Sequence, residues 1–135
     1  MIEWGPLNDQ GIPEGQSIRD AFEITPRAAR DLVARGEAII LDCRTDEEWE
    51  HCHIPGSEHI PLHELEQRLD DLEGDTPILT ICHHGRRSVT AALTLQARGR
   101  RGARSIFGGI DLWALDIDPS IPRYERDASG CRTVS

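Results

Sequence analysis

The chain has 135 residues, a hydrophobic fraction of 38% and a formal net charge of −9 at pH 7. This length supports one domain with a substantial core, and the acidic balance argues against general nucleic-acid binding. No apolar run approaches the roughly 18 residues of a membrane span, and residues 1–6 lack the basic and apolar regions of a signal peptide. We therefore expect a cytoplasmic protein that binds neither nucleic acid nor membrane.

The first part of the chain predicts an irregular arm followed by alternating strands and helices. Residues 1–20 contain three glycines and two prolines with little periodicity, which indicates an arm without regular structure. A short strand is predicted over 21–24. Thr25 followed by Pro26 marks a helix start, because a hydroxyl caps the first turn and proline suits the first helical position. The apolar run over 38–43 is typical of a central parallel strand.

The middle of the chain continues the alternation. Thr45 or Asp46 can cap a short acidic helix. A turn and a brief extended segment follow over 53–61. Leucines on one side and acidic residues on the other predict a weak helix over 62–72, and a strand follows over 78–81.

The last part adds a helix over 87–98, a strand over 104–107 and a short helix over 110–115. Strands that alternate with helices predict an α/β fold whose parallel sheet is covered on both faces. We expect one domain over 21–124 and a flexible tail over 125–135.

One stretch joins a strand to a helix through a polar loop, and it contains the candidate site residues Cys82, His83, His84, Gly85, Arg86, Arg87 and Ser88. Backbone N–H groups at a helix start attract negative charge, and thiols there ionise more easily. Cys82 is therefore a candidate nucleophile, although it could also be one more small core residue at a strand end. Ligands bind at the carboxyl ends of parallel strands, where Asp42, Arg44 and Gly108 would join Cys82.

The other cysteines are Cys43, Cys52 and Cys131. A disulfide framework is not expected in a cytosolic chain with an ordinary core. The run from His51 to His53 invites a zinc interpretation, but adjacent residues rarely point at one metal and no second ligand pair has suitable spacing. We expect neither a metal nor a cofactor.

Four sequence pieces occur in a fixed order: Leu41-Asp42-Cys43-Arg44 with Glu47-Glu48-Trp49, His53-Ile54-Pro55-Gly56-Ser57 with Ile60-Pro61, the Cys82 loop with Arg87-Ser88, and Gly108-Gly109-Ile110 with Trp113. Together they resemble the rhodanese-like single-domain sulfurtransferases, from about Phe22 to Tyr124. The resemblance implies a rhodanese-like domain with a central, mostly parallel five-stranded sheet and helices on both faces.

The resemblance also implies a reaction. Cys82 would take sulfane sulfur from a donor such as thiosulfate, hold it as a persulfide, and pass it to cyanide, a thiol or a protein. Two successive displacements give ping-pong kinetics. Backbone N–H groups from His83 to Ser88 would surround the outer sulfur, and Arg87 would hold the loop or attract an oxyanion. A cysteine desulfurase or a sulfur-carrier pathway protein is a possible partner.

Alternative functions remain open. The protein could relay persulfide sulfur from one protein to another, or it could be a non-catalytic binding module of the same fold. Retention of the loop cysteine favours a catalytic protein. Phosphatase or arsenate-reductase activity is disfavoured, because those enzymes place the loop arginine one position further along than Arg87.

The two loop histidines stand where many thiosulfate-active relatives have a cationic residue. Because an unperturbed imidazole titrates near pH 6.5, His83 and His84 predict sulfur transfer from thiosulfate that varies between about pH 5.5 and 7.5.

Supporting roles are expected for residues around the loop. Asp42 and Arg44 would pair at its base, and Glu48 would hold Arg44. Ser88 would cap the helix or donate to the persulfide. Cys43 and Cys52 are interpreted as packed, inert thiols.

Overall fold

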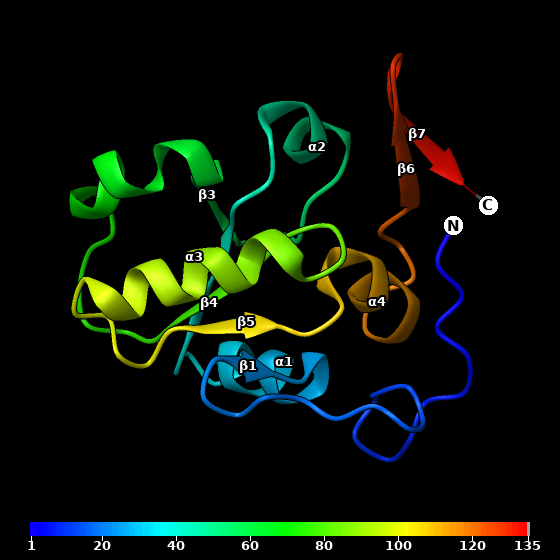
Figure 1. The fold of residues 1–135 in the computed structure, drawn as a ribbon, viewed down its shortest axis with the longest axis horizontal. Helices are drawn as coiled ribbons and strands as arrows, with labels where there is room; N and C mark the ends of the chain where they lie inside the picture. Colours follow the sequence, from blue (N-terminus) through cyan, green and yellow to red (C-terminus); the bar gives the residue numbers. More distant parts are fainter. Residues whose placement is uncertain (135) are drawn as a thin grey trace.

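The computed structural model describes residues 1–134 and contains one five-stranded parallel sheet (Figure 1). Its strands are β1 (Glu23–Ile24), β2 (Ile39–Asp42), β3 (Glu58–His59), β4 (Ile78–Ile81) and β5 (Arg104–Ile106). They lie in the order β1-β5-β4-β2-β3, and each neighbouring pair is parallel. The predicted α/β fold with a parallel five-stranded sheet is confirmed.

Helices cover both faces of this sheet (Figure 1). They are α1 (Pro26–Ala34), α2 (Asp46–His51), the 3-10 segment η1 (Leu62–Asp71), α3 (Arg86–Ala97) and α4 (Gly109–Asp116). The weak helix predicted over 62–72 is thus a 3-10 segment, and its backbone is non-helical at Arg68. Two of the predicted caps are present: Thr25 accepts the N–H of Ala28, and Thr45 forms a capping box with Glu48.

Two apolar clusters divide the core by sheet face. One cluster joins α1 and α4 to the sheet, through residues that include Ala29, Ile40, Leu79, Ile81, Ile110 and Trp113. The other joins α3 and η1 to the opposite face, through residues that include Leu41, Leu65, Ile78, Cys82 and Leu95. Because side chains alternate along a strand, Ile81 points into the first cluster and Cys82 into the second. Cys82 therefore lies beneath the start of α3.

A β-hairpin occupies most of the segment predicted as a flexible tail. Strands β6 (Arg123–Asp127) and β7 (Gly130–Val134) pair in antiparallel fashion, which corrects that expectation for residues 125–134; Ser135 lies outside the described residues. Polar contacts fix the hairpin to α2, since the N–H of Cys131 donates to Glu47 at 2.9 Å. The sequence lacks an apolar stripe here, so periodicity could not reveal these strands.

The N-terminal arm is irregular, as predicted for residues 1–20. It contains a single β-bridge, between Leu7 and Pro13, and no helix. Ile12 is buried, and the indole N–H of Trp4 donates to Asp111 at the start of α4. Among the residues that the structure describes, no helix has the length and apolar character that a membrane span requires.

Candidate active site

Cys82 follows β4, and its side chain is only 1% exposed. Its Sγ accepts the backbone N–H of Gly85 at 3.1 Å and lies 3.3 Å from the Oγ of Ser88. The Ser88 hydroxyl is in turn 2.7 Å from the Oγ of Ser105. A negative charge on the sulfur would therefore meet one backbone donor and one hydroxyl donor.

The expectation that Ser88 caps the helix was wrong. Gly85 is the N-cap of α3, in a left-handed conformation with no side-chain cap bond. Ser88 lies one turn further along, where its hydroxyl reaches the sulfur of Cys82. The Cys82 thiol donates to the Ser88 hydroxyl oxygen, and at this distance Ser88 would become a donor once the sulfur loses its proton, which is the second role predicted for Ser88.

The start of α4 is hydrogen-bonded to the backbone of the Cys82 loop. The N–H groups of Ile110 and Asp111, which have no partner within their helix, donate to the carbonyls of Cys82 at 2.8 Å and His83 at 3.1 Å. Gly109 permits this approach because a Cβ there would lie only 2.4 Å from the His83 carbonyl oxygen. The glycine-rich turn after β5 therefore supports the loop directly.

We expect Gly109→Ala to lower the free energy of unfolding by more than about 2 kcal/mol, because the new methyl group overlaps the loop backbone and φ is +65°. Gly36→Ala is the matched control: φ is +72°, but nothing lies within 4 Å of its Cβ position, so about 1 kcal/mol is expected. Urea unfolding of both variants measures the difference. Equal losses of unfolding free energy in the two variants would contradict the close approach of Gly109 to the His83 carbonyl.

A cavity of about 740 Å³ opens beside Cys82. Its lining residues are Met1, Ile2, Cys82, His83, His84, Arg86, Arg87, Tyr124, Glu125 and Arg126. The predicted loop residues are thus brought together: most line the cavity, while Gly85 and Ser88 contact the sulfur. The contribution of β6 to the wall was not predicted.

Glu48 is the centre of a buried network beside this cavity. Its carboxylate, 1% exposed, accepts two N–H groups of Arg87 at 2.7 and 3.0 Å, the hydroxyl of Tyr124 at 2.6 Å and one N–H of Arg126 at 2.9 Å. Burial acts to raise the pKa of Glu48, but these partners outweigh it and hold the pKa well below its usual range. The expectation that Glu48 holds Arg44 was wrong for the carboxylate, since Arg44 reaches only the Glu48 carbonyl.

Asp42 and Arg44 form the expected pair, with both side chains fully buried and 2.6 Å between them. Burial acts to lower the pKa of Arg44, but the bonds and charge of Asp42 outweigh it, and the pKa is raised. Arg44 also donates to the hydroxyl of Tyr124 at 3.0 Å and the carbonyl of Cys52 at 2.6 Å. The pair does not line the cavity but supports its wall through Tyr124.

The two loop histidines form a stack with Tyr124, in which the His83 ring lies between those of His84 and Tyr124. The ring of His83 lies 3.7 Å from that of His84 and 3.9 Å from that of Tyr124, between centroids, and its Nε2–H donates to the Tyr124 carbonyl. Burial, together with the neighbouring His84, lowers the pKa of His83 to about 4, and burial also lowers the pKa of His84. His83 is thus neutral between pH 5.5 and 7.5, which removes the basis for the predicted attraction of anions by His83 in that window.

We expect acid to destabilise the protein through His83. Because its folded pKa of about 4 lies below the unfolded value near 6.5, its contribution to stability is full above pH 6.5 and is lost as pH falls toward 4. Between pH 7 and 4, the wild type should lose about 2 kcal/mol more unfolding free energy than His83→Gln. Urea titrations at both pH values test this, with the exposed His63→Gln as control. If the wild type and His83→Gln lost the same unfolding free energy between pH 7 and 4, the lowered pKa of His83 would be refuted.

His83, His84 and Asp111 also bring three possible metal ligands within 4.8 Å of one another. The Asp111 carboxylate already accepts N–H groups from Trp4 at 2.8 Å and from Arg123 at 2.8 and 3.0 Å. The protein's own hydrogen bonds therefore account for this cluster.

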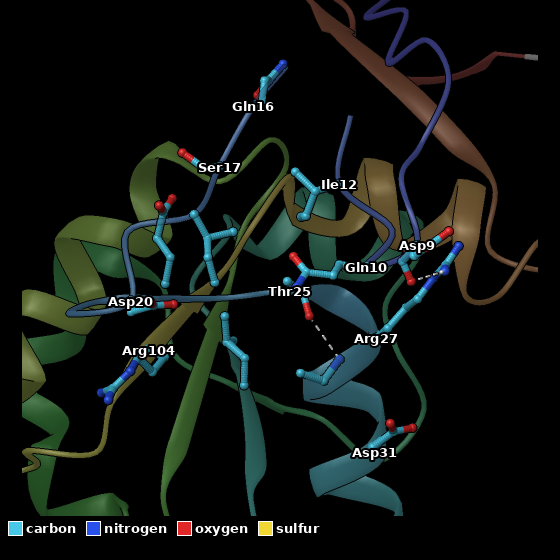
Figure 2. Close-up of a pocket in the computed structure, with 14 residues that line it drawn as sticks. Asp9, Gln10, Ile12, Gln16, Ser17, Asp20, Thr25, Arg27, Asp31 and Arg104 are labelled. Atoms are coloured by element: carbon cyan, nitrogen blue, oxygen red, sulfur yellow. Dashed lines mark hydrogen bonds between the residues drawn. The ribbon is translucent and has the colours of Figure 1, made fainter. Parts of the chain in front are cut away.

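A second hollow, of about 800 Å³, lies between the N-terminal arm and α1 (Figure 2). It shares no lining residue with the Cys82 cavity. Two of its polar side chains make hydrogen bonds within the fold: Thr25 caps α1, and Arg27 donates to the carbonyl of Asp9 and to Asp116. Its lining contains no cysteine or histidine, whereas the lining of the Cys82 cavity contains both.

The remaining cysteines are free thiols. Cys43 is buried and donates to the carbonyl of Ile81 at 3.3 Å, and burial raises its pKa well above the usual value. Burial also raises the pKa of Cys52 and Cys131. These environments disfavour thiolates, so Cys82 is the candidate nucleophile.

Comparisons with known proteins agree with this fold. A family model described as Rhodanese-like domain matches residues 25–116. YrkF of Bacillus subtilis, whose name proposes that it is a sulfur carrier protein, is 41% identical over 108 residues, which are 79% of this chain and 58% of YrkF. The thiosulfate sulfurtransferase GlpE of Pseudomonas syringae is 33% identical over 90 residues, which are 67% of this chain and 84% of GlpE.

A solved structure has a similar fold. The human single-domain sulfurtransferase TSTD1 superposes with a TM-score of 0.62 and 28% sequence identity, over 71% of this chain and 97% of that one. The present chain spans little more than half of YrkF. The matched segment 25–116 nevertheless contains the whole sheet except β1, as well as the Cys82 loop. The chain therefore belongs to the rhodanese-like domain family.

Proposed function

We propose that the protein is a sulfurtransferase in which Cys82 carries sulfane sulfur as a persulfide. The observation that supports this most is the pairing of the Cys82 sulfur with the Gly85 N–H and the Ser88 hydroxyl at the edge of an open cavity. The Gly85 N–H donates to the sulfur, and the Ser88 hydroxyl, which accepts from the thiol, would donate to the thiolate, so both groups favour a negatively charged sulfur. The cationic rim of Arg86, Arg87 and Arg126 suits a small anionic donor.

With thiosulfate as donor, the Cys82 thiolate attacks the sulfane sulfur. A new S–S bond forms to Cys82, the donor's S–S bond breaks, and sulfite leaves with the bonding electron pair. In the second half-reaction, cyanide or a thiolate attacks the outer sulfur, and the Cys82 thiolate is regenerated. Because each displacement leaves the enzyme competent for the other, ping-pong kinetics follow.

Two sulfur sources are consistent with this chemistry. The name of GlpE favours thiosulfate, whereas the name of YrkF favours exchange between proteins, with a cysteine desulfurase as donor or a sulfur-carrier protein as acceptor. A phosphatase is disfavoured, because Arg87 is held by two bonds to Glu48 rather than aimed at a phosphate.

Thiocyanate production distinguishes these sources. With thiosulfate and cyanide, the wild type should form thiocyanate with ping-pong kinetics, and Cys82→Ser should lose at least about 1,000-fold in kcat/KM. Thiocyanate that appears only when a cysteine desulfurase and cysteine replace thiosulfate would select the protein relay. Unchanged activity in Cys82→Ser would overturn the proposal for either source.

A further inference from the structure

The β6–β7 hairpin lies beyond the segment that the family model matches, residues 25–116, yet it forms one wall of the Cys82 cavity. Tyr124, Glu125 and Arg126 of β6 all line that cavity. The hairpin is fixed to α2 by the contacts of Arg126 with Glu48 and of Cys131 with Glu47. Its side chains are therefore held beside the Cys82 loop.

The charges at this wall do not balance. Arg87 and Arg126 both donate to the same oxygen of Glu48, at 2.7 and 2.9 Å, and guanidinium groups stay charged. Burial raises the pKa of Tyr124 well above its usual range, so its hydroxyl is neutral. Two positive charges thus share one negative charge, and one positive charge is in excess.

The other charged groups that line the cavity leave this excess uncompensated. Arg44 and Asp42 neutralise each other behind Tyr124, and the Glu125 carboxylate is engaged by the chain's amino terminus and by Arg132. Arg86, exposed on the rim, adds further positive charge. The cavity therefore favours an anion.

The two guanidinium groups at Glu48 differ in how much of each is available. Arg87 uses both terminal nitrogens on Glu48 and is 27% exposed. Arg126 uses only Nη1, within residues 1–134, and is 47% exposed. Arg126 can thus present further N–H groups to a ligand while it keeps its bond to Glu48.

We propose that Arg126 binds the oxyanion end of a small anionic sulfur donor and thereby helps to direct its sulfane sulfur toward Cys82. This inference rests on the proposed sulfurtransferase function, and it assigns donor recognition to the hairpin. The ligand class is a small sulfonate-like or thiosulfate-like anion, which guanidinium binds with charge-assisted hydrogen bonds.

Binding can be measured separately from sulfur transfer in a Cys82→Ser background. We expect calorimetry to show that Arg126→Gln weakens thiosulfate binding by about tenfold, since a hydrogen bond to a charged group contributes about that much. Arg98→Gln is the matched control, because Arg98 is an exposed arginine that pairs with Glu66 and does not line the cavity. It should bind thiosulfate as the background protein does.

In proteins that retain Cys82, Arg126→Gln should raise the KM for thiosulfate about tenfold and change kcat less than about threefold. Arg126→Lys, which keeps the charge and perturbs the fold least, should recover part of the loss. Equal binding in the Arg126→Gln and Arg98→Gln proteins, or no thiosulfate binding to the background protein, would overturn the inference. Failure of the sulfurtransferase proposal itself would appear differently, as a wild type that never acquires sulfur on Cys82.

Discussion

Replacing Glu48 by glutamine should lower the free energy of unfolding by about 3–5 kcal/mol, as expected when one partner of a buried ion pair is removed. The carboxylate is 1% exposed and binds Arg87, Arg126 and the Tyr124 hydroxyl. An amide cannot accept from all three while balancing their charge. Because Arg87 and Tyr124 both line the Cys82 cavity, we also expect kcat/KM to fall by about 10- to 100-fold.

Urea unfolding and steady-state kinetics test this prediction, with Glu50→Gln as the matched control. Glu50 is an exposed neighbour in the same helix, so its replacement should change stability by less than about 0.5 kcal/mol. The pH dependence provides a second readout. Since the folded pKa of Glu48 is lowered, its contribution is present above the unfolded value near 4.3 and is lost as pH falls below it. A Glu48→Gln protein as stable as Glu50→Gln would contradict the network.

Replacing Arg44 by methionine should lower the free energy of unfolding by a similar amount, about 3–5 kcal/mol, because the fully buried Asp42 carboxylate loses its partner. The substitution also removes donors from the Tyr124 hydroxyl and the Cys52 carbonyl. Arg35→Met is the matched control, since Arg35 pairs with Glu37 at the surface and an exposed pair contributes about 0–1 kcal/mol.

A double variant separates the effect of the stranded charge from lost contacts. Asp42→Asn combined with Arg44→Met leaves no buried charge, so we expect it to be more stable than Arg44→Met alone by at least about 1 kcal/mol. Thermal and urea unfolding of the wild type, Asp42→Asn, Arg44→Met and the double variant complete the cycle. If the double variant were less stable than Arg44→Met, lost contacts rather than the unpaired Asp42 carboxylate would account for most of the lost stability.

The sequence predicts local features of the site well, because they depend on short-range patterns. The apolar run before Cys82 and the helical spacing after it place the thiol at a strand-to-helix junction, and the structure has that junction. Thr25 and Thr45 act as caps as expected, since capping depends on residues within one turn. The convergence of Cys82 with Gly108-Gly109 follows from the rule for carboxyl ends of parallel strands.

The Ser88 cap is a local prediction that fails, but three other failed predictions depend on partners far along the chain. Glu48 is 39 positions from Arg87 and 76 from Tyr124, and no periodicity encodes such a choice of partner. His83 loses its expected charge because Tyr124 buries it, and Tyr124 is 41 positions away. The hairpin is missed for the same reason, since distant polar contacts to α2 and the packing of Tyr124 and Cys131 hold it without an apolar stripe in its sequence.

Intact mass spectrometry tests the central claim, that Cys82 alone holds the transferred sulfur. After incubation with thiosulfate or with a cysteine desulfurase and cysteine, the wild type should gain one sulfur, about 32 Da, and lose it to cyanide. A variant with serine at positions 43, 52 and 131 should gain the same mass, and Cys82→Ser should gain none. Sulfur retained by Cys82→Ser, or absent from the wild type with both donors, would contradict the account.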